Sequence, residues 1–472
     1  MNSSAHKRVI VIGAGITGLA AAHRLRELAP DVDVTVLEAG PRAGGVLETV
    51  RLDRYLIEHS ADNFITNVPW AIDLCRRIGL ADELIATSTE QRGALVVHRG
   101  KIERVPAGFM LMAPARLWPM LTTPLLSPLG KLRLLAERFI PRRRSPGDET
   151  LASFARRRLG REVFENIVQP LVGGIYTADP EKLSLAATLP RFLEMERKHG
   201  SLIRAARAAE NPAPENTESG VRYGLFWTLR DGLTSLVERI VETLPPGSVR
   251  LNSPVRHIRR EHDGTWVVAL ASGEPLLADS LIVATGAPQA ARLLGAVDET
   301  AAKLLGQIEY AGTSIVSLVY RRSDIARPLD AFGFVVPAVE KRRILAGSFS
   351  SLKFAGRAPD DQVLVRVFIG GALQRELAEL PDDELQRIAT EELRDLIGVR
   401  GEPLLVDIAR WPASMPQYHL GHLALVAAIE AAAERHRGLA LCGSAYHGVG
   451  IPHCIHSGEL AAERTLAALG VT

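Results

Sequence analysis

Cysteine is scarce in this chain of 472 residues: only three are present, at positions 75, 442 and 454, and no two of them form a C-x-x-C pair. Three cysteines cannot build a disulfide framework, so we expect a reducing, cytoplasmic compartment. Residues 1–8 are polar, which predicts no signal peptide. The nearest approach to a membrane span, residues 105–129, is interrupted by five prolines and an arginine, whereas a span takes ~20 apolar residues.

A large net charge is also missing. The sequence has 56 basic and 54 acidic residues and a formal net charge of +2, so no global field favours nucleic acid as a partner. Hydrophobic residues make up 47% and charged residues 23%, the balance of an ordinary globular protein. The length exceeds what one compact core accommodates, and two or three domains are expected.

The first fifty residues have the pattern of a dinucleotide-binding unit. Residues 8–12 predict a buried parallel strand, and a G-x-G-x-x-G turn, an alanine-rich helix and a second strand at residues 32–37 follow. The glycines allow a tight turn, a close approach to pyrophosphate and close packing of helix on strand, and the acid after the second strand can bind a ribose. The residues predicted to bind the nucleotide are Gly13, Ala14, Gly15, Ile16, Thr17, Gly18, Glu38 and Ala39.

The residues after Glu38 distinguish FAD from NAD. They read EAGPRAGG, which resembles the extended signature of the FAD-dependent amine oxidase and desaturase superfamily. The resemblance implies that Arg42 neutralises phosphate charge and that Gly44 and Gly45 let the backbone pass close to the flavin.

Segments far along the chain complete the predicted cofactor domain. The strand at residues 280–284 with its following turn, and Val255, match superfamily positions, the latter one whose backbone contacts adenine. Residues 439–443 predict another strand, and a glycine-rich loop then leads to a helix from about residue 451. A helix N-terminus placed in this way stabilises negative charge on a reduced flavin. The FAD-binding domain is therefore expected to be discontinuous.

Four longer stretches resemble the oxygen-dependent porphyrinogen oxidases, the FAD enzymes that act on protoporphyrinogen or coproporphyrinogen III in heme biosynthesis. They are GGIYTADPEKLSL (173–185), RDGLTSL (230–236), RWPASMPQYHLGH (410–422) and GSAYHGVGIPHCIHSGELAA (443–462). The resemblance implies that a porphyrinogen loses six electrons to become the aromatic porphyrin, while oxygen becomes hydrogen peroxide. The flavin carries the chemistry, and no catalytic acid or base is assigned.

The same resemblance supplies further site residues. The FAD-contacting positions are Ser60, Ala61, Asp62, Asn63, Trp411, Gly443, Val449, Gly450 and Ile451. The substrate-lining positions are Gly174, Ile175, Tyr176, Phe332, Gly333 and Phe368, whose apolar and aromatic side chains suit a flat macrocycle. His453 and His456 lack a second ligand pair, so no metal site is predicted. Cys454 does not match the covalent attachment motif of monoamine oxidases, so FAD is expected to be bound non-covalently.

Two departures from the family pattern bear on the substrate. Ala94 stands where protoporphyrinogen oxidases have an arginine proposed to anchor a propionate, and Arg92, two residues earlier, is the alternative anchor. Some coproporphyrinogen III oxidases also lack that arginine, and coproporphyrinogen carries four propionates against two in protoporphyrinogen. This favours coproporphyrinogen. The family's usual Gly-Pro is replaced by Ser60-Ala61.

The predicted fold class is α/β, with a discontinuous Rossmann-like FAD-binding domain (1–90, 221–295 and 416–472). An α+β substrate-binding sheet domain (296–415) and a helical subdomain for substrate access (91–220) are inserted between its pieces. The helical part contains basic runs at residues 142–144 and 156–158. These runs predict either a solvated face or a surface that attracts a membrane or the propionates.

Rival functions remain open at this point. An amine oxidase or carotenoid desaturase has the same nucleotide motifs, but not the stretches RWPASMPQY and GVGIPHCI. A non-catalytic flavin- and porphyrin-binding protein would bind both molecules without turnover. The expected partners are a porphyrinogen, oxygen, a peripheral membrane contact at the inner face and the next heme-pathway enzyme as recipient of the product. The sequence alone leaves the oligomeric state, the exact porphyrinogen and other electron acceptors open.

Overall fold

The apolar strands at both ends of the chain form one parallel sheet. In this computed structural model, which describes residues 6–89, 93–145, 147–209 and 226–471, the five strands lie in the order β12, β2, β1, β16, β22, each parallel to its neighbours. Their bounds are Val249–Arg250, Asp33–Leu37, Arg8–Ile12, Ser280–Val283 and Leu439–Leu441. β1 and β16 are buried because they lie in the centre of the sheet.

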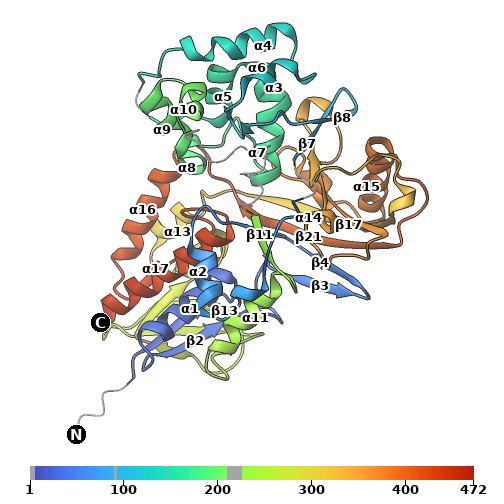
Figure 1. Cartoon of the computed structure of the whole chain (residues 1–472). Coiled ribbons are helices and arrows are strands. Elements are labelled where there is room, and N and C mark those ends of the chain that lie inside the picture. The colour runs from blue at the N-terminus through green and yellow to red at the C-terminus, as the bar shows by residue number, and fades with distance from the viewer. Residues whose placement is uncertain (1–5, 90–92, 146, 210–225, 472) are drawn as a thin grey trace.

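The first and last helices pack against each other beside this sheet. Figure 1 shows α1 (Ile16–Leu28) in blue next to α17 (Ile451–Leu469) in red. The contact depends on Gly458, because a Cβ there would lie 2.2 Å from the carbonyl oxygen of Thr17. With α11 (Thr234–Thr243) and α2 (Trp70–Arg77), these helices bury one side of the parallel sheet.

The other side of the parallel sheet is covered by a small antiparallel sheet and three helices. The sheet consists of β13 (Val255–Arg260), β14 (Trp266–Leu270) and β15 (Leu276–Ala278), and the helices are α12 (Ala287–Leu294), α13 (Glu299–Leu305) and α16 (His422–Glu434). The predicted nucleotide-binding architecture, assembled from both ends of the chain, is confirmed.

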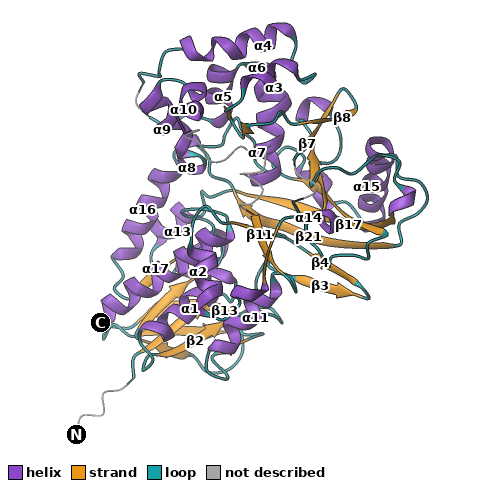
Figure 2. Ribbon diagram, in the orientation of Figure 1, coloured by secondary structure: helices purple, strands orange, loops and turns teal. Residues whose placement is uncertain are grey.

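A seven-stranded sheet forms the second part of the molecule, at the right in Figure 2. Its order is β21 (Leu405–Pro416), β17 (Tyr310–Arg321), β20 (Gln362–Gly370), β19 (Ala346–Phe349), β18 (Gly333–Val335), β7 (Leu95–His98) and β8 (Lys101–Arg104). Neighbours are antiparallel except β18 and β7. The hairpin β7–β8, which falls in the segment predicted to be helical, thus pairs with strands from residues 310–416; the domain division itself stays a prediction.

The two faces of this sheet have different neighbours. One face carries Val316, Val367 and other aliphatic side chains that pack under α15 (Asp382–Ile397). The opposite face carries a row of directly paired residues, Asp407, Ser317, Arg366, Ser348 and Gly333. Directly paired residues share a face, and the next residues along β21 and β20 on that face are Ala409, Trp411 and Phe368. We call this the site face.

Shorter elements connect the two sheets. The hairpin β3 (Thr49–Leu52) and β4 (Tyr55–Glu58) packs Tyr55 and Ile57 against Val319 and Leu364 of the site face. A three-stranded sheet joins β5 (Phe64–Ile65), β11 (Phe226–Leu229) and β6 (Leu84–Ala86). The remaining short elements are η1 (Ala81–Glu83), β9 (Phe109–Met110), β10 (Ala113–Pro114), η5 (Arg322–Asp324), η6 (Ala338–Glu340), α14 (Ser350–Lys353) and η7 (Arg375–Glu379).

The third part is a layer of helices, at the top of Figure 1. It comprises α3 (Leu117–Thr122), α4 (Pro128–Leu135), η2 (Ala136–Phe139), α5 (Leu151–Leu159), α6 (Arg161–Val163), η3 (Phe164–Val168), α7 (Gln169–Tyr176), α8 (Leu185–Thr188), α9 (Pro190–His199) and α10 (Leu202–Ala209). These helices pack around one apolar core, to which Val96 of β7 and Tyr418 also contribute. Across the described ranges, none of the helices is both long enough and apolar enough to span a bilayer.

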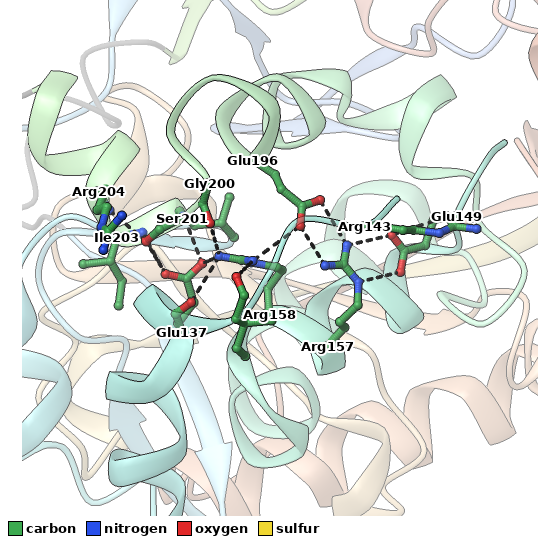
Figure 3. A network of polar contacts seen from close by, with 12 residues as sticks. Glu137, Arg143, Glu149, Arg157, Arg158, Glu196, Gly200, Ser201, Ile203 and Arg204 are labelled. Atoms are coloured by element: carbon green, nitrogen blue, oxygen red, sulfur yellow. Dashed lines mark hydrogen bonds and ion pairs between the residues drawn. The ribbon is translucent and has the colours of Figure 1, made fainter. Parts of the chain in front are cut away.

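The predicted basic run points partly inward. Arg158 is fully buried and pairs with the equally buried Glu137, and Arg157 donates to both Glu149 and Glu196 at 2.7 to 3.2 Å. Figure 3 shows this chain of charges crossing the helical layer. Part of the run is therefore neither a solvated face nor a ligand surface, because carboxylates from neighbouring helices pair with it.

Candidate functional site

The turn between β1 and α1 is closely packed at Gly13 and Gly18 but leaves open space beside Gly15. Gly13 has a φ of +105°, and a Cβ there would lie 2.7 Å from the carbonyl oxygen of Ala284. At Gly18 a Cβ would come within 1.9 Å of the oxygen of Gly13, whereas at Gly15 it would meet no atom within 4 Å. No side chain caps the start of α1. The backbone N–H groups of Ile16 and Thr17 therefore begin a helix that faces open space, as pyrophosphate binding requires.

Glu38 closes the other side of this turn. Its carboxylate accepts hydrogen bonds from the N–H groups of Ala14 at 2.9 Å and Gly40 at 2.8 Å. Its own carbonyl accepts from the N–H of Ser253 at 2.7 Å, which places Val255 two residues away on the neighbouring strand. Ala39 is exposed beside them. The structure thus brings the predicted ribose and adenine positions together.

The paired glycines after Arg42 lie directly against the first motif. The N–H of Gly44 donates to the oxygen of Ala14 at 2.7 Å, and a Cβ on Gly45 would lie 3.2 Å from the Cα of Gly15. Arg42 bonds to Glu48 at 2.9 Å and to the oxygen of Gly45 at 2.8 Å. Its guanidinium therefore shapes this loop, and its role toward phosphate stays a prediction.

His59 is a site residue that sequence reasoning missed. Its ring nitrogens lie 2.9 Å from Glu48 and 2.9 Å from Asp407 of the site face. The hydrogen bond to Asp407, helped by Glu48 and opposed by burial, raises the pKa of His59 above its usual value. The indole Nε1–H of Trp411 donates to the His59 carbonyl at 2.6 Å. No local pattern marks this residue, because its partners lie 11 and 348 positions away.

The segment Ser60–Asn63 is held by two cations, Lys353 at the end of α14 and Arg366 on β20. Lys353 lies 3.0 Å from the buried carboxylate of Asp62, and Arg366 lies 3.5 Å from it and also donates to the carbonyl of Ser60. Burial alone would raise the pKa of Asp62, but the charges of Lys353 and Arg366 and the hydrogen bonds of Lys353 and Asn63 lower it to about 2. The family resemblance predicted this segment but neither of its cationic partners.

Segments predicted to line a substrate cavity lie near one another. A Cβ on Gly174 would lie 3.3 Å from the Cγ1 of Val335, the end of the strand that starts at Gly333. Phe332 donates its N–H to the carbonyl of Gly93 at 3.3 Å. Phe368 lies under the Arg366 guanidinium, 5.3 Å from the ring centroid.

Tyr176 and its neighbours complete the substrate side. The hydroxyl of Tyr176 donates to the carbonyl of Thr188 at 3.1 Å, and burial raises its pKa to about 12. Ile175 is 44% exposed. Tyr176, on the predicted substrate side, and Val449, on the predicted flavin side, pack with Val335 against the same apolar cluster. Arg92, the alternative propionate anchor, lies outside the described residues.

The C-terminal loop ends at the start of α17. Gly443 has a φ of +139° and donates its N–H to Ser457 at 3.1 Å. Gly450 begins the helix, no side chain caps it, and no acid stands in the first turn that starts at Ile451. Burial raises the pKa of the Cys454 thiol to about 11. Among the described residues, no group of three or more His, Cys, Asp or Glu side chains is arranged to hold a metal ion.

The chemistry of these donors fits FAD. Two helix starts without side-chain caps, α1 and α17, offer backbone N–H groups for anionic parts of the cofactor. The open space at Gly15 admits a close backbone approach, and the buried Ser60 hydroxyl has no hydrogen-bond partner in the part of the chain that is described. Glu38 supplies the acceptor for a ribose.

Comparison with known proteins extends these observations over the whole chain. The profile of a family described as Flavin containing amine oxidoreductase matches residues 16–466. The chain is 38% identical to a coproporphyrinogen III oxidase of Propionibacterium freudenreichii subsp. freudenreichii, over 99% of this chain and 93% of the relative. It is 27% identical to protoporphyrinogen oxidase 2 of Arabidopsis thaliana, over 98% and 94%. A crystal structure of a candidate protoporphyrinogen oxidase from Exiguobacterium sp. 255-15 superposes with a TM-score of 0.88 at 30% identity, covering 100% of both chains.

Proposed function

Because the chain belongs to the family of flavin containing amine oxidoreductases, we propose that it is an FAD-dependent oxidase that converts coproporphyrinogen III to coproporphyrin III in heme biosynthesis. The macrocycle loses six electrons, and oxygen is reduced to hydrogen peroxide. An oxidoreductase of another substrate class, such as an amine oxidase or a carotenoid desaturase, is not favoured, since whole-length similarity runs to porphyrinogen oxidases.

The observation that carries the proposal is that Tyr176, Val335 and Val449 pack against one apolar cluster. It supports a flat substrate with apolar faces next to the start of α17 and below the helical layer. Bound FAD would supply a hydride acceptor for a methylene bridge of the macrocycle. This chain's residues would do the rest: α1 binds pyrophosphate, Glu38 binds a ribose, and Phe368 and Trp411 exclude water.

Two features support coproporphyrinogen as the substrate. Ala94 stands where an anchoring arginine is expected for protoporphyrinogen, and the relative named for coproporphyrinogen is the more similar of the two compared. Four carboxylates require more cationic partners than two do. We propose Arg92 as one of them, although it lies outside the described residues. Binding of FAD is proposed to be non-covalent, because the thiols of Cys75, Cys442 and Cys454 are all buried and have raised pKa values.

A peripheral membrane contact belongs to the same proposal. Four large apolar side chains on the outer helices are exposed, namely Trp118 at 75%, Leu129 at 76%, Leu132 at 63% and Phe139 at 79%. The exposed Arg142, Arg143 and Arg144 follow them in the chain. Apolar side chains beside basic ones fit the surface of an anionic bilayer, where the porphyrin could also pass to the next enzyme. Vesicles of anionic lipid should bind the protein, and Trp118→Ser with Phe139→Ser should abolish binding; wild-type protein that stays unbound would contradict this contact.

The substrate proposal is tested by fluorescence. Purified protein with FAD receives coproporphyrinogen III or protoporphyrinogen IX in air, and porphyrin fluorescence and hydrogen peroxide are followed. We expect faster turnover of the four-propionate substrate. Faster turnover of protoporphyrinogen would identify the enzyme as a protoporphyrinogen oxidase instead. Bound flavin without turnover of either substrate would contradict the porphyrinogen assignment.

A further inference from the structure

The loop between β22 and α17 has little internal support. Gly443 and Gly448 have φ values of +139° and +148°, and a Cβ on Gly448 would lie 2.7 Å from the His453 side chain. α17 starts at Ile451, only three residues after Gly448, with Gly450 as its N-cap. The contacts that hold residues 444–448 therefore also fix the first turn of α17.

The hydroxyl of Tyr418 makes two of these contacts. It donates to the carbonyl of Ser444 at 2.6 Å and accepts from the N–H of Gly448 at 2.8 Å, so it ties both ends of the loop to one atom. The Tyr418 side chain is 2% exposed, and water cannot replace it there without opening the packing. Burial also raises the pKa of Tyr418, so the hydroxyl keeps its proton and both contacts persist at ordinary pH.

His422 reinforces the same loop. Its ring stacks on the Tyr418 ring, with centroids 3.9 Å apart and planes 14° apart, and its Nε2 lies 3.1 Å from the carbonyl of Tyr446, to which it donates. Burial lowers the pKa of His422, which keeps the imidazole neutral. The two side chains reach three backbone groups of residues 444–448.

The backbone around Tyr418 holds a second segment. Its carbonyl accepts from the N–H of Ser184 at 2.7 Å, and the N–H of Leu420 donates to the carbonyl of Lys182 at 3.0 Å. His419 pairs with Leu183 in an isolated β-bridge. Lys182, Leu183 and Ser184 end the substrate loop (residues 173–185), and Figure 1 shows α8, which follows that loop, beside the upper end of α16.

We propose that Tyr418 is a positioning residue that sets the first turn of α17 relative to the flavin and ties that turn to the substrate loop. The inference rests on the proposed function only in that a flavin binds at α17. The first turn of α17 carries a partial positive charge and no acid. Its effect on a reduced, anionic flavin falls off within one turn of helix, so a small shift of the loop lowers the reduction potential.

The decisive variant is Tyr418→Phe, which keeps the ring and its stack but removes both hydroxyl contacts. We expect the two-electron equilibrium of the bound flavin to shift about tenfold toward the oxidised form, which is ~30 mV in reduction potential. The potential is measured by equilibration with a reference dye, together with the affinity for FAD and for sulfite, which binds flavin only where negative charge is stabilised. An unchanged potential and sulfite affinity would overturn the inference.

Tyr446→Phe is the matched control, since this buried tyrosine stands in the same loop and its hydroxyl has no hydrogen-bond partner within the described ranges. It should leave the potential unchanged. If Tyr418→Phe does not fold, His422→Phe is the test, because it removes only the donor to the Tyr446 carbonyl. A smaller shift of the reduction potential in the same direction would support the inference, and an unchanged potential would overturn it. Lost turnover with the expected shift would count against the porphyrinogen substrate alone.

Discussion

The imidazole of His59 joins the loop that follows the paired glycines to the seven-stranded sheet. It lies 2.9 Å from Glu48, which also pairs with Arg42, and 2.9 Å from Asp407. Since the hydrogen bond to Asp407 raises the pKa of His59, the protonated form is the one that binds both carboxylates. The stabilisation is fully present below the ordinary pKa near ~6.5 and is lost as the pH rises through the raised folded-state value.

We therefore expect His59→Gln to lower the free energy of unfolding more at pH 6 than at pH 9. The cost at low pH should be about 1.5–3 kcal/mol, the range for hydrogen bonds to charged groups. Denaturant unfolding of FAD-loaded protein across this pH range measures it. The control is His447→Gln, whose imidazole is 54% exposed beside Glu430. If the difference in free energy of unfolding between wild type and His59→Gln did not become smaller as the pH rises, the proton-linked contact would be refuted.

The stabilisation contributed by Asp62 has the opposite pH dependence to that of His59. Its pKa is lowered to about 2 by Lys353 and Arg366, so its stabilisation is present above pH ~4 and disappears as the pH falls toward 2. Asp62→Asn leaves the buried Arg366 and the partly buried Lys353 without their carboxylate, and we expect it to cost about 3–5 kcal/mol at pH 7 and to weaken FAD binding. Asp231→Asn, which breaks the exposed pair with Arg51, should cost at most ~1 kcal/mol. Equal costs for the two variants would contradict this account.

At the scale of elements, the contact of α1 with α17 sets the distance between two parts of the proposed FAD site. Gly458→Ala places a Cβ 2.2 Å from the Thr17 carbonyl and 3.1 Å from the Ala21 nitrogen. Both are backbone atoms, so the helices must separate. We expect a loss of about 1–3 kcal/mol, as for other overpacked cores, and a higher dissociation constant for FAD by titration of the apoprotein.

Gly306→Ala is the control for that helix contact, since its Cβ would come no closer than 3.4 Å to another atom and its backbone is helical. FAD affinity should be unchanged there. Wild-type affinity in Gly458→Ala would show that the spacing of α1 and α17 does not govern the cofactor site.

The elements also show what sequence reasoning could reach. The turn from Gly13 to Gly18 was predictable, because its chemistry is local to one strand, one turn and one helix. Lys353 and Arg366 were not, because they meet Asp62 only once β20 joins the sheet and α14 follows β19 beside it. The inward course of Arg158 was hidden for a similar reason: its partner Glu137 is on another helix.

At the scale of the whole molecule, the helical layer shares its apolar core with Val96 of β7 and with Tyr418, but the buried ion pair of Glu137 and Arg158 lies wholly within the layer. Glu137 binds Arg158 and accepts from the N–H of Leu202 at 2.8 Å, while Arg158 also donates to the carbonyl of Gly200 at 3.0 Å. The network thus joins η2, α5 and the turn before α10. Because few of these contacts reach the nucleotide-binding part, damage to the network should act on the helical layer first.

Glu137→Gln tests this separation. It leaves the fully buried Arg158 without its carboxylate, and we expect about 3–5 kcal/mol of destabilisation that appears as an early unfolding phase, by hydrogen exchange, limited to residues 117–209. Arg161→Gln, which breaks an ion pair whose arginine side chain is 80% exposed, should cost below ~1 kcal/mol. FAD binding should persist through the early phase, because α1 and α17 lie in the other part of the molecule. A single transition that releases FAD together with all protected amides would show instead that the helical layer and the nucleotide-binding part unfold as one unit.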